Sequence, residues 1–257
     1  MSARSDGLVA ELQAEHAVLD ELLVSLSDDQ WDLPTPARGW QVRHQVAHLA
    51  YFDWVGTASA AGDPSRLRAI REQSAGLRDG HAVSLMLLQS RLPMAPADLL
   101  ADWRANAAAL RETFRSTPGD PKVLWGAGPM SFDSFITARL METWAHGLDC
   151  FAAVGREPVD TDRIRHVCHI GYRALPHGFR RARREMPAPL DQLRLELTSP
   201  SGQSWAFGPD DAPNVVRGPA GQWARVAVQR MRPAEARGLS ADGALAKQAI
   251  EVARAFV

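Results

Sequence analysis

Apolar residues recur at helical spacing through most of the first half of the chain. The repeat predicts a first amphipathic helix that ends near residues 27–29 and is built on Leu8, Leu12, Leu19, Leu22, Leu23 and Leu26. Similar repeats without internal breakers predict long helices over about residues 41–61, 96–116 and 131–154. The pattern therefore indicates four long helices before residue 155.

Glycine and proline mark the connections between these helices. Residues 31–40 and 117–130 contain both residue types, which predicts loops, the second of them directly before the fourth helix. Residues 66–92 keep a helical pattern that Gly76 and Gly80 interrupt. This pattern predicts shorter helices that cover one end of the helical assembly.

The second half of the chain mixes helical and alternating patterns. A helical stretch over residues 161–184 ends before two prolines, and alternation over 193–198 followed by the segment 205–208 predicts a β-hairpin. Two more helical runs follow, over residues 223–230 and 242–257. The pattern predicts an α+β fold that is mainly α, with a helical domain over residues 1–155 and a linker helix with a small α+β domain over residues 156–257.

The composition is typical of a water-soluble globular protein. Of the 257 residues, 46% are hydrophobic and 23% charged, and no apolar run approaches the roughly 18 residues that a membrane span needs. The N-terminus lacks the apolar segment of a signal peptide, so we expect a cytoplasmic protein without membrane contact. Cys150 and Cys168 are too few and too far apart for a disulfide framework or a redox pair, and a thiol used in catalysis would come from outside.

Charge is distributed unevenly along the chain. Residues 1–155 carry 13 basic and 19 acidic side chains, whereas residues 156–257 carry 16 and 11, although the net charge is only −1. Such a balance argues against binding to nucleic acid, which requires a broad basic face. The densest basic run is interpreted as a solvated or domain-facing surface in preference to an anion site, and consists of Arg180, Arg181, Arg183 and Arg184.

Candidate chemistry lies on the second and fourth predicted helices. Glu142 and His146 are four residues apart and therefore share one helical face, and the apolar residues around them indicate burial. Together with a histidine of the second helix they would form a set of two imidazoles and one carboxylate, which suits Zn²⁺ and leaves a fourth position open. The alternative is a helical ion pair without a metal.

The second helix offers two histidines for the third ligand. His44 and His48 are themselves four apart, as in helical zinc motifs, but Gln45 stands where the zinc protease motif requires glutamate. A rival cluster of metal-binding residue types occurs further along the chain, at His166, Cys168, His169 and His177. Adjacent residues point apart on a helix, which makes a complete ligand set there unfavourable.

Two motifs resemble a known family. The segment Trp40-x-Val42-x-x-x-x-Ala47-His48-Leu49, followed by Trp54, and the pair Glu142-x-x-x-His146 resemble the DinB-like thiol-dependent metalloenzymes, specifically the mycothiol-dependent maleylpyruvate isomerase group. The resemblance implies a metal-binding four-helix bundle followed by a small α+β domain, with His48, Glu142 and His146 as metal ligands. It also implies mycothiol as the thiol. The arginine bias of the chain, which contains only two lysines, indicates a high-GC bacterial source, and such bacteria include makers of mycothiol.

Other residues could support the site. Arg139 and Asp149 lie one turn on either side of the ligand pair, where each could orient a ligand, bind substrate or form a buried salt bridge or cap. Trp125, in the glycine-rich loop, is predicted to contact substrate, and His44 is a further candidate beside the site. His16 is expected on the polar face of the first helix, with cavity lining as the alternative.

We therefore expect a metal-dependent enzyme that activates a low-molecular-weight thiol toward a small electrophilic substrate, as an isomerase or thiol S-transferase. One alternative is a hydrolase that uses metal-bound water. Another is a non-catalytic small-molecule-binding or stress-associated protein, in which a fourth protein ligand such as His44 or His16 would close the site. Zn²⁺ is the favoured metal, although Ni²⁺, Co²⁺ and Fe²⁺ also accept this ligand set.

Overall fold

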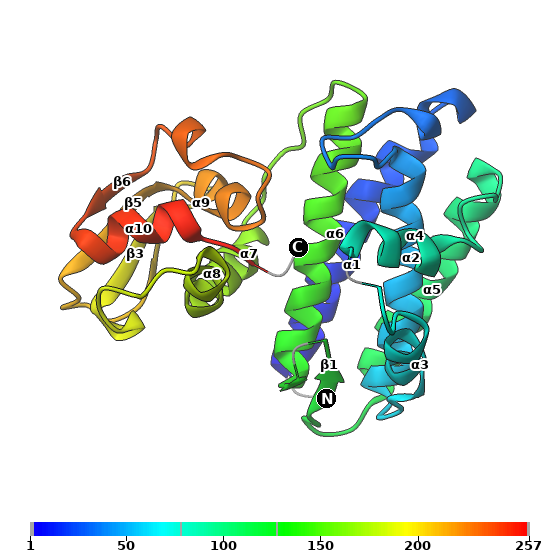
Figure 1. Ribbon diagram of the computed structural model, residues 1–257, viewed down its shortest axis with the longest axis horizontal. Coiled ribbons are helices and arrows are strands. Elements are labelled where there is room, and N and C mark those ends of the chain that lie inside the picture. Colours follow the sequence, from blue (N-terminus) through cyan, green and yellow to red (C-terminus); the bar gives the residue numbers. More distant parts are fainter. Residues whose placement is uncertain (1–2, 78, 127, 256–257) are drawn as a thin grey trace. The chain divides into compact units, whose positions relative to one another are not determined.

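The structure is a computed structural model that describes residues 3–77, 79–126 and 128–255 (Figure 1). The residues that the structure does not describe are Met1, Ser2, Arg78, Ala127, Phe256 and Val257. Predictions made above for these positions therefore lie outside the described residues. The chain divides into two compact units, Met1–Glu157 and Pro158–Val257. This division falls near the boundary expected between residues 155 and 156.

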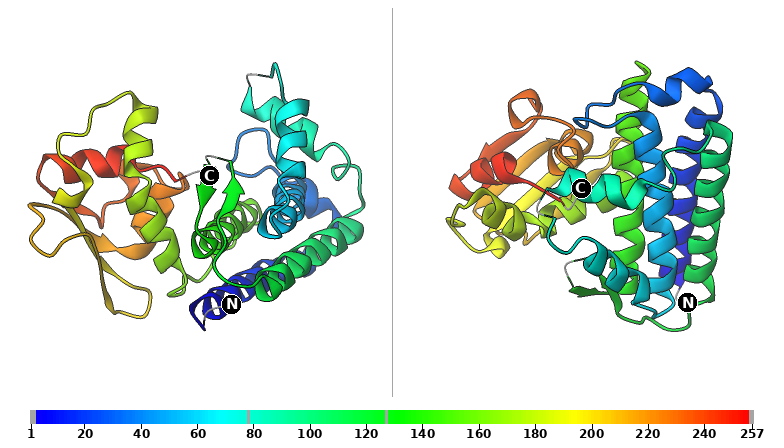
Figure 2. Two further views of the ribbon diagram at one scale, coloured as in Figure 1. Left: turned by 90° about the horizontal axis from the view of Figure 1, so that it is seen from below. Right: turned by 45° about the vertical axis from the view of Figure 1, so that its right-hand side comes forward.

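Four long helices form the framework of the first unit. They lie side by side as a bundle (Figure 2) and are α1 (Ala3–Val24), α2 (Val42–Ala60), α5 (Pro96–Ser116) and α6 (Phe132–Ala153). Helix α2 packs against both α5 and α6, and α1 packs against the same two helices. The expected mainly helical α+β fold is confirmed, and helices from distant parts of the sequence share one interior.

Local signals explain where these helices begin. The side-chain oxygen of Ser131 accepts a hydrogen bond from the backbone N–H of Ser134 at 3.2 Å, which caps the N-terminus of α6. Pro96 occupies the first turn of α5, where its missing N–H costs nothing. The apolar stripes then meet in a common core, which includes Leu19, Leu23, Val46, Leu49, Leu99 and Trp103.

Short elements connect the long helices. The predicted shorter helices are present as α3 (Ser65–Gln73) and α4 (Gly80–Leu88), and a 3-10 helix, η1 (Asp28–Asp32), precedes the 33–41 segment. The expectation of a loop over all of residues 117–130 is wrong, because β1 (Val123–Trp125) and β2 (Gly128–Met130) pair as an antiparallel hairpin. Glycine and proline end regular helices, but they are equally compatible with a tight hairpin.

The second unit combines a four-stranded sheet with four helices among its described residues. The strands are β3 (Leu193–Thr198), β4 (Ser204–Phe207), β5 (Asn214–Pro219) and β6 (Ser240–Asp242), in the order β4-β3-β5-β6. The helices are α7 (Ile164–Arg173), α8 (Leu175–Ala182), α9 (Ala220–Ala227) and α10 (Ala244–Val252), and two 3-10 helices are η2 (Leu190–Gln192) and η3 (Pro233–Glu235). The expected hairpin is present as the antiparallel pair β3–β4.

Two expectations for the second unit are wrong, and one strand was not predicted. The helical stretch over residues 161–184 consists of two helices, because Pro176 at the start of α8 cannot continue the hydrogen-bond ladder of α7. Strand β5, which pairs in parallel with β3, was not predicted, since its pairing depends on a distant strand. The last helix begins at Ala244, because the preceding residues form β6 and the turn at Gly243.

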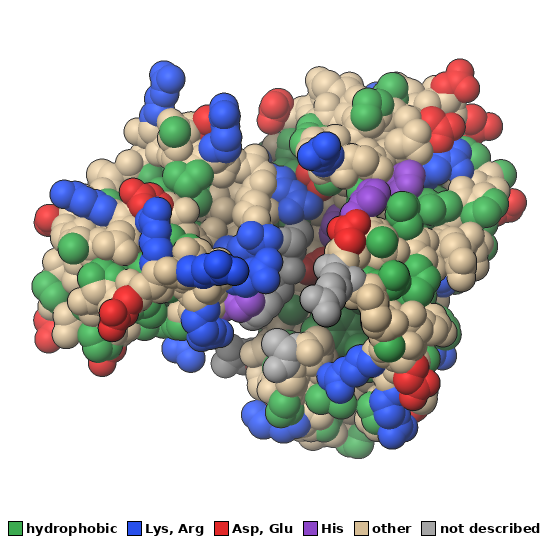
Figure 3. All heavy atoms as spheres, in the orientation of Figure 1, with side chains coloured by type: hydrophobic (Ala, Val, Ile, Leu, Met, Phe, Trp, Pro, Cys, Tyr) green, Lys and Arg blue, Asp and Glu red, His purple; other side chains and the backbone are tan. Residues whose placement is uncertain are grey.

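The surface of the second unit is rich in arginine. All four arginines of the run over residues 180–184 are exposed, and Figure 3 shows Lys and Arg side chains gathered over this unit. One of them, Arg184, forms an exposed ion pair with Glu251 at 2.6 Å. None of the helices within the described residues combines the length and apolar character required to cross a membrane.

Candidate metal centre

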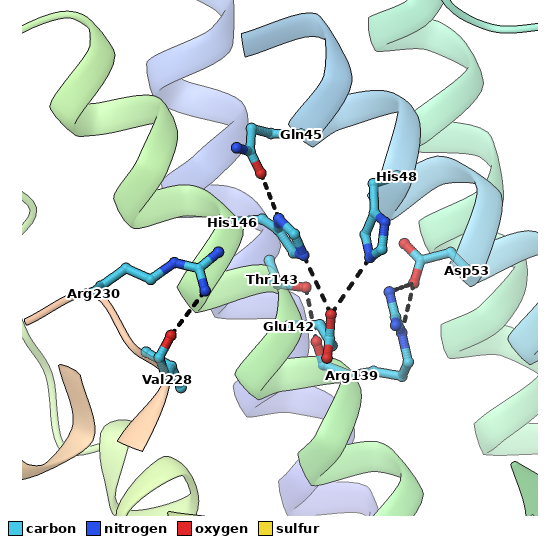
Figure 4. A network of polar contacts seen from close by, with 9 residues as sticks. All are labelled: Gln45, His48, Asp53, Arg139, Glu142, Thr143, His146, Val228 and Arg230. Atoms are coloured by element: carbon cyan, nitrogen blue, oxygen red, sulfur yellow. Dashed lines mark hydrogen bonds and ion pairs between the residues drawn. The ribbon is translucent and has the colours of Figure 1, made fainter. Parts of the chain in front are cut away.

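Two helices of the bundle bring together His48, from α2, and the pair Glu142 and His146, from α6 (Figure 4). Oε2 of Glu142 lies 3.3 Å from Nε2 of His146 and 3.6 Å from Nε2 of His48. The two imidazole rings have centroids 4.4 Å apart, and one candidate ligand atom from each residue lies within 4.8 Å of the others. Side chains nearly a hundred residues apart in sequence therefore converge on one point.

The cluster is partly shielded from solvent. His146 is buried, whereas the side chains of His48 and Glu142 remain 16% and 17% exposed. Burial by itself would raise the pKa of Glu142, but the imidazoles of His146 and His48 beside the carboxylate outweigh it and hold that pKa well below its ordinary value. The carboxylate is therefore anionic at neutral pH and suited to a cation.

The donor set fits a divalent cation of intermediate softness. Two imidazole nitrogens and one carboxylate oxygen are ligands that Zn²⁺ accepts in catalytic sites. Nδ1 of His146 is engaged by Oε1 of Gln45 at 2.5 Å, which leaves Nε2 directed at the cluster. Nδ1 of His48 is buried without a hydrogen-bond partner among the described residues, and its Nε2 also faces Glu142. Both rings thus present the same nitrogen to the common point.

Comparison with known protein families identifies the family of this chain. The family model of the mycothiol maleylpyruvate isomerase N-terminal domain matches residues 12–151, a range that contains all three converging side chains. The chain belongs to the mycothiol maleylpyruvate isomerase family. The expectation of an enzyme from this family is thereby confirmed.

Relatives in sequence and in structure match nearly the whole chain. Uncharacterized proteins of Mycobacterium tuberculosis strains CDC 1551 / Oshkosh and ATCC 25618 / H37Rv are each 37% identical over 96% of this chain and 94% of their own. Crystal structures of the mycothiol-dependent maleylpyruvate isomerase and of its variant with one histidine replaced by alanine match with TM-scores of 0.60 and 0.61. They cover 92% of each chain at 16% and 15% identity, which supports the shared fold. The mycobacterial relatives support an actinobacterial origin of this chain.

In this family member, Arg139 forms a buried ion pair directly beside the cluster. Its side chain is 2% exposed and donates from Nη2 and Nε to Oδ1 of Asp53, at 3.0 and 3.2 Å (Figure 4). Burial raises the pKa of Asp53, while the charge and hydrogen bonds of Arg139 act in the opposite direction. Of the roles considered for Arg139, the structure therefore supports the buried salt bridge.

Asp149, the other flanking candidate, is 1% exposed and lies next to the buried Cys150. Burial and the neighbouring charge of Asp149 raise the pKa of the Cys150 thiol, which keeps this thiol protonated. Cys150 is therefore a buried thiol that is poorly suited to act as a nucleophile. A role for Asp149 in orienting a ligand stays a prediction.

Aromatic rings line the approach to the histidines. Trp40 stacks on His146, with ring centroids 6.0 Å apart and planes inclined by 17°, and it also lies 5.4 Å from His48. Phe52 contacts His48 at 4.6 Å, and Trp125 lies 6.1 Å from Phe52. Trp125 therefore contacts Phe52, which in turn contacts His48 of the cluster. Its contact with substrate stays a prediction.

His44 and His16 have partners other than the cluster. Nδ1 of His44 accepts a hydrogen bond from the backbone N–H of Gln41 at 3.2 Å, at the N-terminus of α2, and burial with the charge of Arg43 lowers the pKa of His44. The expectation that His16 lies on a polar face is wrong: it is 4% exposed, and Arg111 donates to its Nδ1. The polar neighbours of His16 come from α5, which its own helix does not reveal.

The rival group around Cys168 does not assemble. Within the described residues, the set of potential metal ligands that converge consists of His48, Glu142 and His146. The thiol of Cys168 instead donates to the carbonyl oxygen of Ala220 at 3.5 Å, in the core between α7 and α9.

Sequence reasoning missed two polar residues of the site. Gln45 and Asp53 are both fully buried, and they lie with Leu49 on one stripe of α2 at steps of four residues. Gln45 contacts His146, and Asp53 contacts Arg139. The sequence contains a signal that could have found them. Gln45 and Asp53 are polar residues on the apolar face of the second helix, and buried polar groups need partners.

Proposed function

We propose that this protein is a metal-dependent enzyme that activates a thiolate at an open His₂Glu site, with His48, Glu142 and His146 as the protein ligands. The convergence of these three side chains on one point carries the proposal. A metal ion with three protein ligands keeps a position for an exogenous molecule, as catalytic zinc sites do. The bundle, in this assignment, is the metal-binding domain, and residues 156–257 form a separate small α+β domain.

The thiol is mycothiol and the substrate a small electrophile. Membership in the mycothiol maleylpyruvate isomerase family supports the choice of thiol. His48, Glu142 and His146 would hold a Zn²⁺ ion, which lowers the pKa of a coordinated thiol, so that the thiol loses its proton to solvent near neutral pH and becomes a nucleophile without a strong general base. The burial of Cys150 and Cys168 agrees with a thiol that comes from outside the chain.

The reaction is an isomerisation of a conjugated double bond or an S-transfer. In the isomerisation, the sulfur adds to one alkene carbon and the electron pair moves onto the conjugated carbonyl. Rotation about the resulting single bond and expulsion of the thiolate restore the double bond in its other configuration. In the S-transfer, the thiolate displaces a leaving group and the carbon–sulfur bond remains.

The side chains around the cluster provide the environment for such a step. The rings of Trp40 and Phe52 lie against the two histidines and restrict the access of water to the sulfur. Arg139 and Asp53 neutralise each other. The positive charge of a metal ion at the cluster would therefore be balanced mainly by the carboxylate of Glu142 and the incoming thiolate.

The proposal is tested by measuring metal content and thiol-dependent turnover together. The purified wild-type protein is expected to contain one Zn²⁺ per chain and to convert electrophiles only when mycothiol, and not glutathione, is present, with net loss of thiol in an S-transfer and none in an isomerisation. His146→Ala is expected to lose both, whereas His169→Ala, at an exposed position in the second unit, keeps both.

Three results would contradict the proposal. Stoichiometric metal in His146→Ala would remove the ligand assignment. Metal-dependent hydrolysis that needs no thiol would favour bound water as the nucleophile, and metal binding without turnover of any kind would favour a binding protein.

A further inference from the structure

The imidazole of His146 is held from behind by a glutamine of the facing helix. Oε1 of Gln45 lies 2.5 Å from Nδ1 of His146, on the side of the ring opposite Glu142 (Figure 4). Gln45 is fully buried on α2, and the two residues are 101 positions apart in sequence. A buried amide in this place has little freedom to exchange its partner for water.

Gln45 belongs to a series of hydrogen bonds that runs from Trp40 through Thr35 to His146, and the donor and acceptor of each bond follow from the bond at Trp40. The carbonyl oxygen of Trp40 only accepts, so the hydroxyl of Thr35, 3.1 Å away, donates to it. Because that hydroxyl has one hydrogen, its oxygen accepts the hydrogen bond from Nε2 of Gln45 at 2.9 Å. The amide of Gln45 is thereby oriented with its carbonyl oxygen toward His146.

An amide carbonyl oxygen can only accept, so Nδ1 of His146 must carry a hydrogen. In the neutral ring, Nε2 then keeps its lone pair, and this is the atom that faces the cluster. From this chain of donors and acceptors we propose that Gln45 is a positioning residue: it holds His146 in the Nδ1–H tautomer, with Nε2 directed at the metal. The proposal rests on the metal site proposed above.

The same side chain also connects the ligand to the segment that carries Trp40. Besides its hydroxyl, the backbone N–H of Thr35 donates to the carbonyl oxygen of Trp40 at 2.8 Å, which closes this segment into a compact turn. The indole of Trp40 stacks on His146. Gln45 therefore fixes both the ring that binds the metal and the backbone that places an aromatic cover on that ring.

The test compares metal affinity across variants of Gln45. Gln45→Met keeps the length of the side chain but removes both hydrogen bonds, and we expect its Zn²⁺ affinity, measured by chelator competition, to fall about 10- to 100-fold. Gln45→Glu keeps an acceptor for Nδ1 of His146 and is expected to bind at least as tightly as the wild type. The visible spectrum of the Co²⁺-loaded protein should change in Gln45→Met and remain close to that of the wild type in Gln45→Glu.

Ser59→Ala is the matched control, because Ser59 is a buried polar residue of the same helix outside the site. It should leave Zn²⁺ affinity and the Co²⁺ spectrum unchanged. Should Gln45→Met fail to fold, Thr35→Val decides instead, since it frees the amide of Gln45 and is expected to weaken Zn²⁺ binding severalfold.

Folded Gln45→Met, or Thr35→Val in its place, with wild-type affinity for Zn²⁺ and an unchanged Co²⁺ spectrum would overturn the role of Gln45 while leaving the proposed function intact. A wild-type protein that binds no Zn²⁺ at all would instead contradict the proposed function. The two failures are therefore distinguishable by the wild-type measurement alone.

Discussion

At the scale of single residues, the interior of the bundle holds more ionisable groups than the candidate metal centre uses. Arg139 pairs with Asp53, and Arg111 donates to His16. These groups come from all four long helices. Buried ionic groups remain compatible with a stable fold only while each keeps its partner.

The first prediction concerns the pair of Asp53 and Arg139. Asp53→Asn preserves the shape of the side chain but leaves the guanidinium of Arg139 without its carboxylate, and we expect the free energy of unfolding to fall by about 3 kcal/mol. Urea denaturation monitored by circular dichroism measures this loss. The double variant Asp53→Asn with Arg139→Met should recover part of it, whereas a stability of Asp53→Asn equal to that of the wild type would show that the pair is dispensable.

The second prediction concerns His16 and pH. Burial and the charge of Arg111 lower the pKa of His16 well below its ordinary value, so the folded protein binds fewer protons here than the unfolded chain does as the pH falls below about 6.5. Folding stability associated with His16 is therefore fully present above that pH and declines on acidification, by up to about 1.4 kcal/mol per pH unit.

His16→Asn offers an oxygen to Arg111 but does not titrate. Its free energy of unfolding, measured in urea between about pH 5 and pH 7, should fall less steeply on acidification than that of the wild type. His169→Asn, at an exposed histidine, should retain the wild-type slope. Parallel curves for the wild type and His16→Asn would contradict the prediction.

At the scale of elements, the close contact between α7 and α9 depends on a glycine. A Cβ added at Gly171 would lie 2.6 Å from Cβ of Ala227 and 3.3 Å from Nε1 of Trp223. Trp223 is itself held by a hydrogen bond to the carbonyl oxygen of Cys168 at 3.1 Å. The glycine therefore allows two helices to approach more closely than any other residue would.

The third prediction follows from this contact. Gly171→Ala should lower the free energy of unfolding of the second unit by about 1–3 kcal/mol, because α7 and α9 must move apart. Gly7→Ala, at an exposed position of α1 with no atom near the added Cβ, should instead stabilise the bundle by about 0.5–1 kcal/mol through helix propensity. Thermal unfolding of both variants tests these two expectations. An unchanged free energy of unfolding in Gly171→Ala would contradict the first, because it would mean that α7 and α9 can move apart without loss of stability.

At the scale of the whole molecule, the candidate metal ligands lie on two helices of the bundle that are distant in the sequence and pack against each other. His48 lies on α2, and Glu142 and His146 lie on α6. A cation bound by all three would therefore act as a cross-link in the folded state, and it has no comparable site in the unfolded chain.

The fourth prediction is a metal-dependent stability of the bundle. At a free Zn²⁺ concentration about 1,000-fold above Kd, binding should add about 4 kcal/mol to the free energy of unfolding. The corresponding rise in Tm is about 10 °C, measured by differential scanning calorimetry with and without a chelator. His48→Ala should unfold at the same temperature in both conditions, and a wild-type protein indifferent to the chelator would contradict the prediction.

Local sequence patterns determined the long helices and the pairing of Glu142 with His146, because a helical period and a spacing of four residues are short-range properties. The motif around His48 selected the third candidate ligand through its resemblance to a family, where spacing alone left His44 as an alternative. The break between α7 and α8 was also encoded locally, in Pro176, although the helical pattern over residues 161–184 predicted one continuous stretch.

Only the tertiary structure decided which residues surround the site. Gln45 contacts His146 across 101 residues, His16 is buried by α5, and β5 pairs in parallel with β3. None of these contacts follows from a period of apolar residues, because they depend on which faces of separate elements meet. The candidate ligands were readable from one helix and one motif, whereas the hydrogen bond that orients His146 arises from packing between elements.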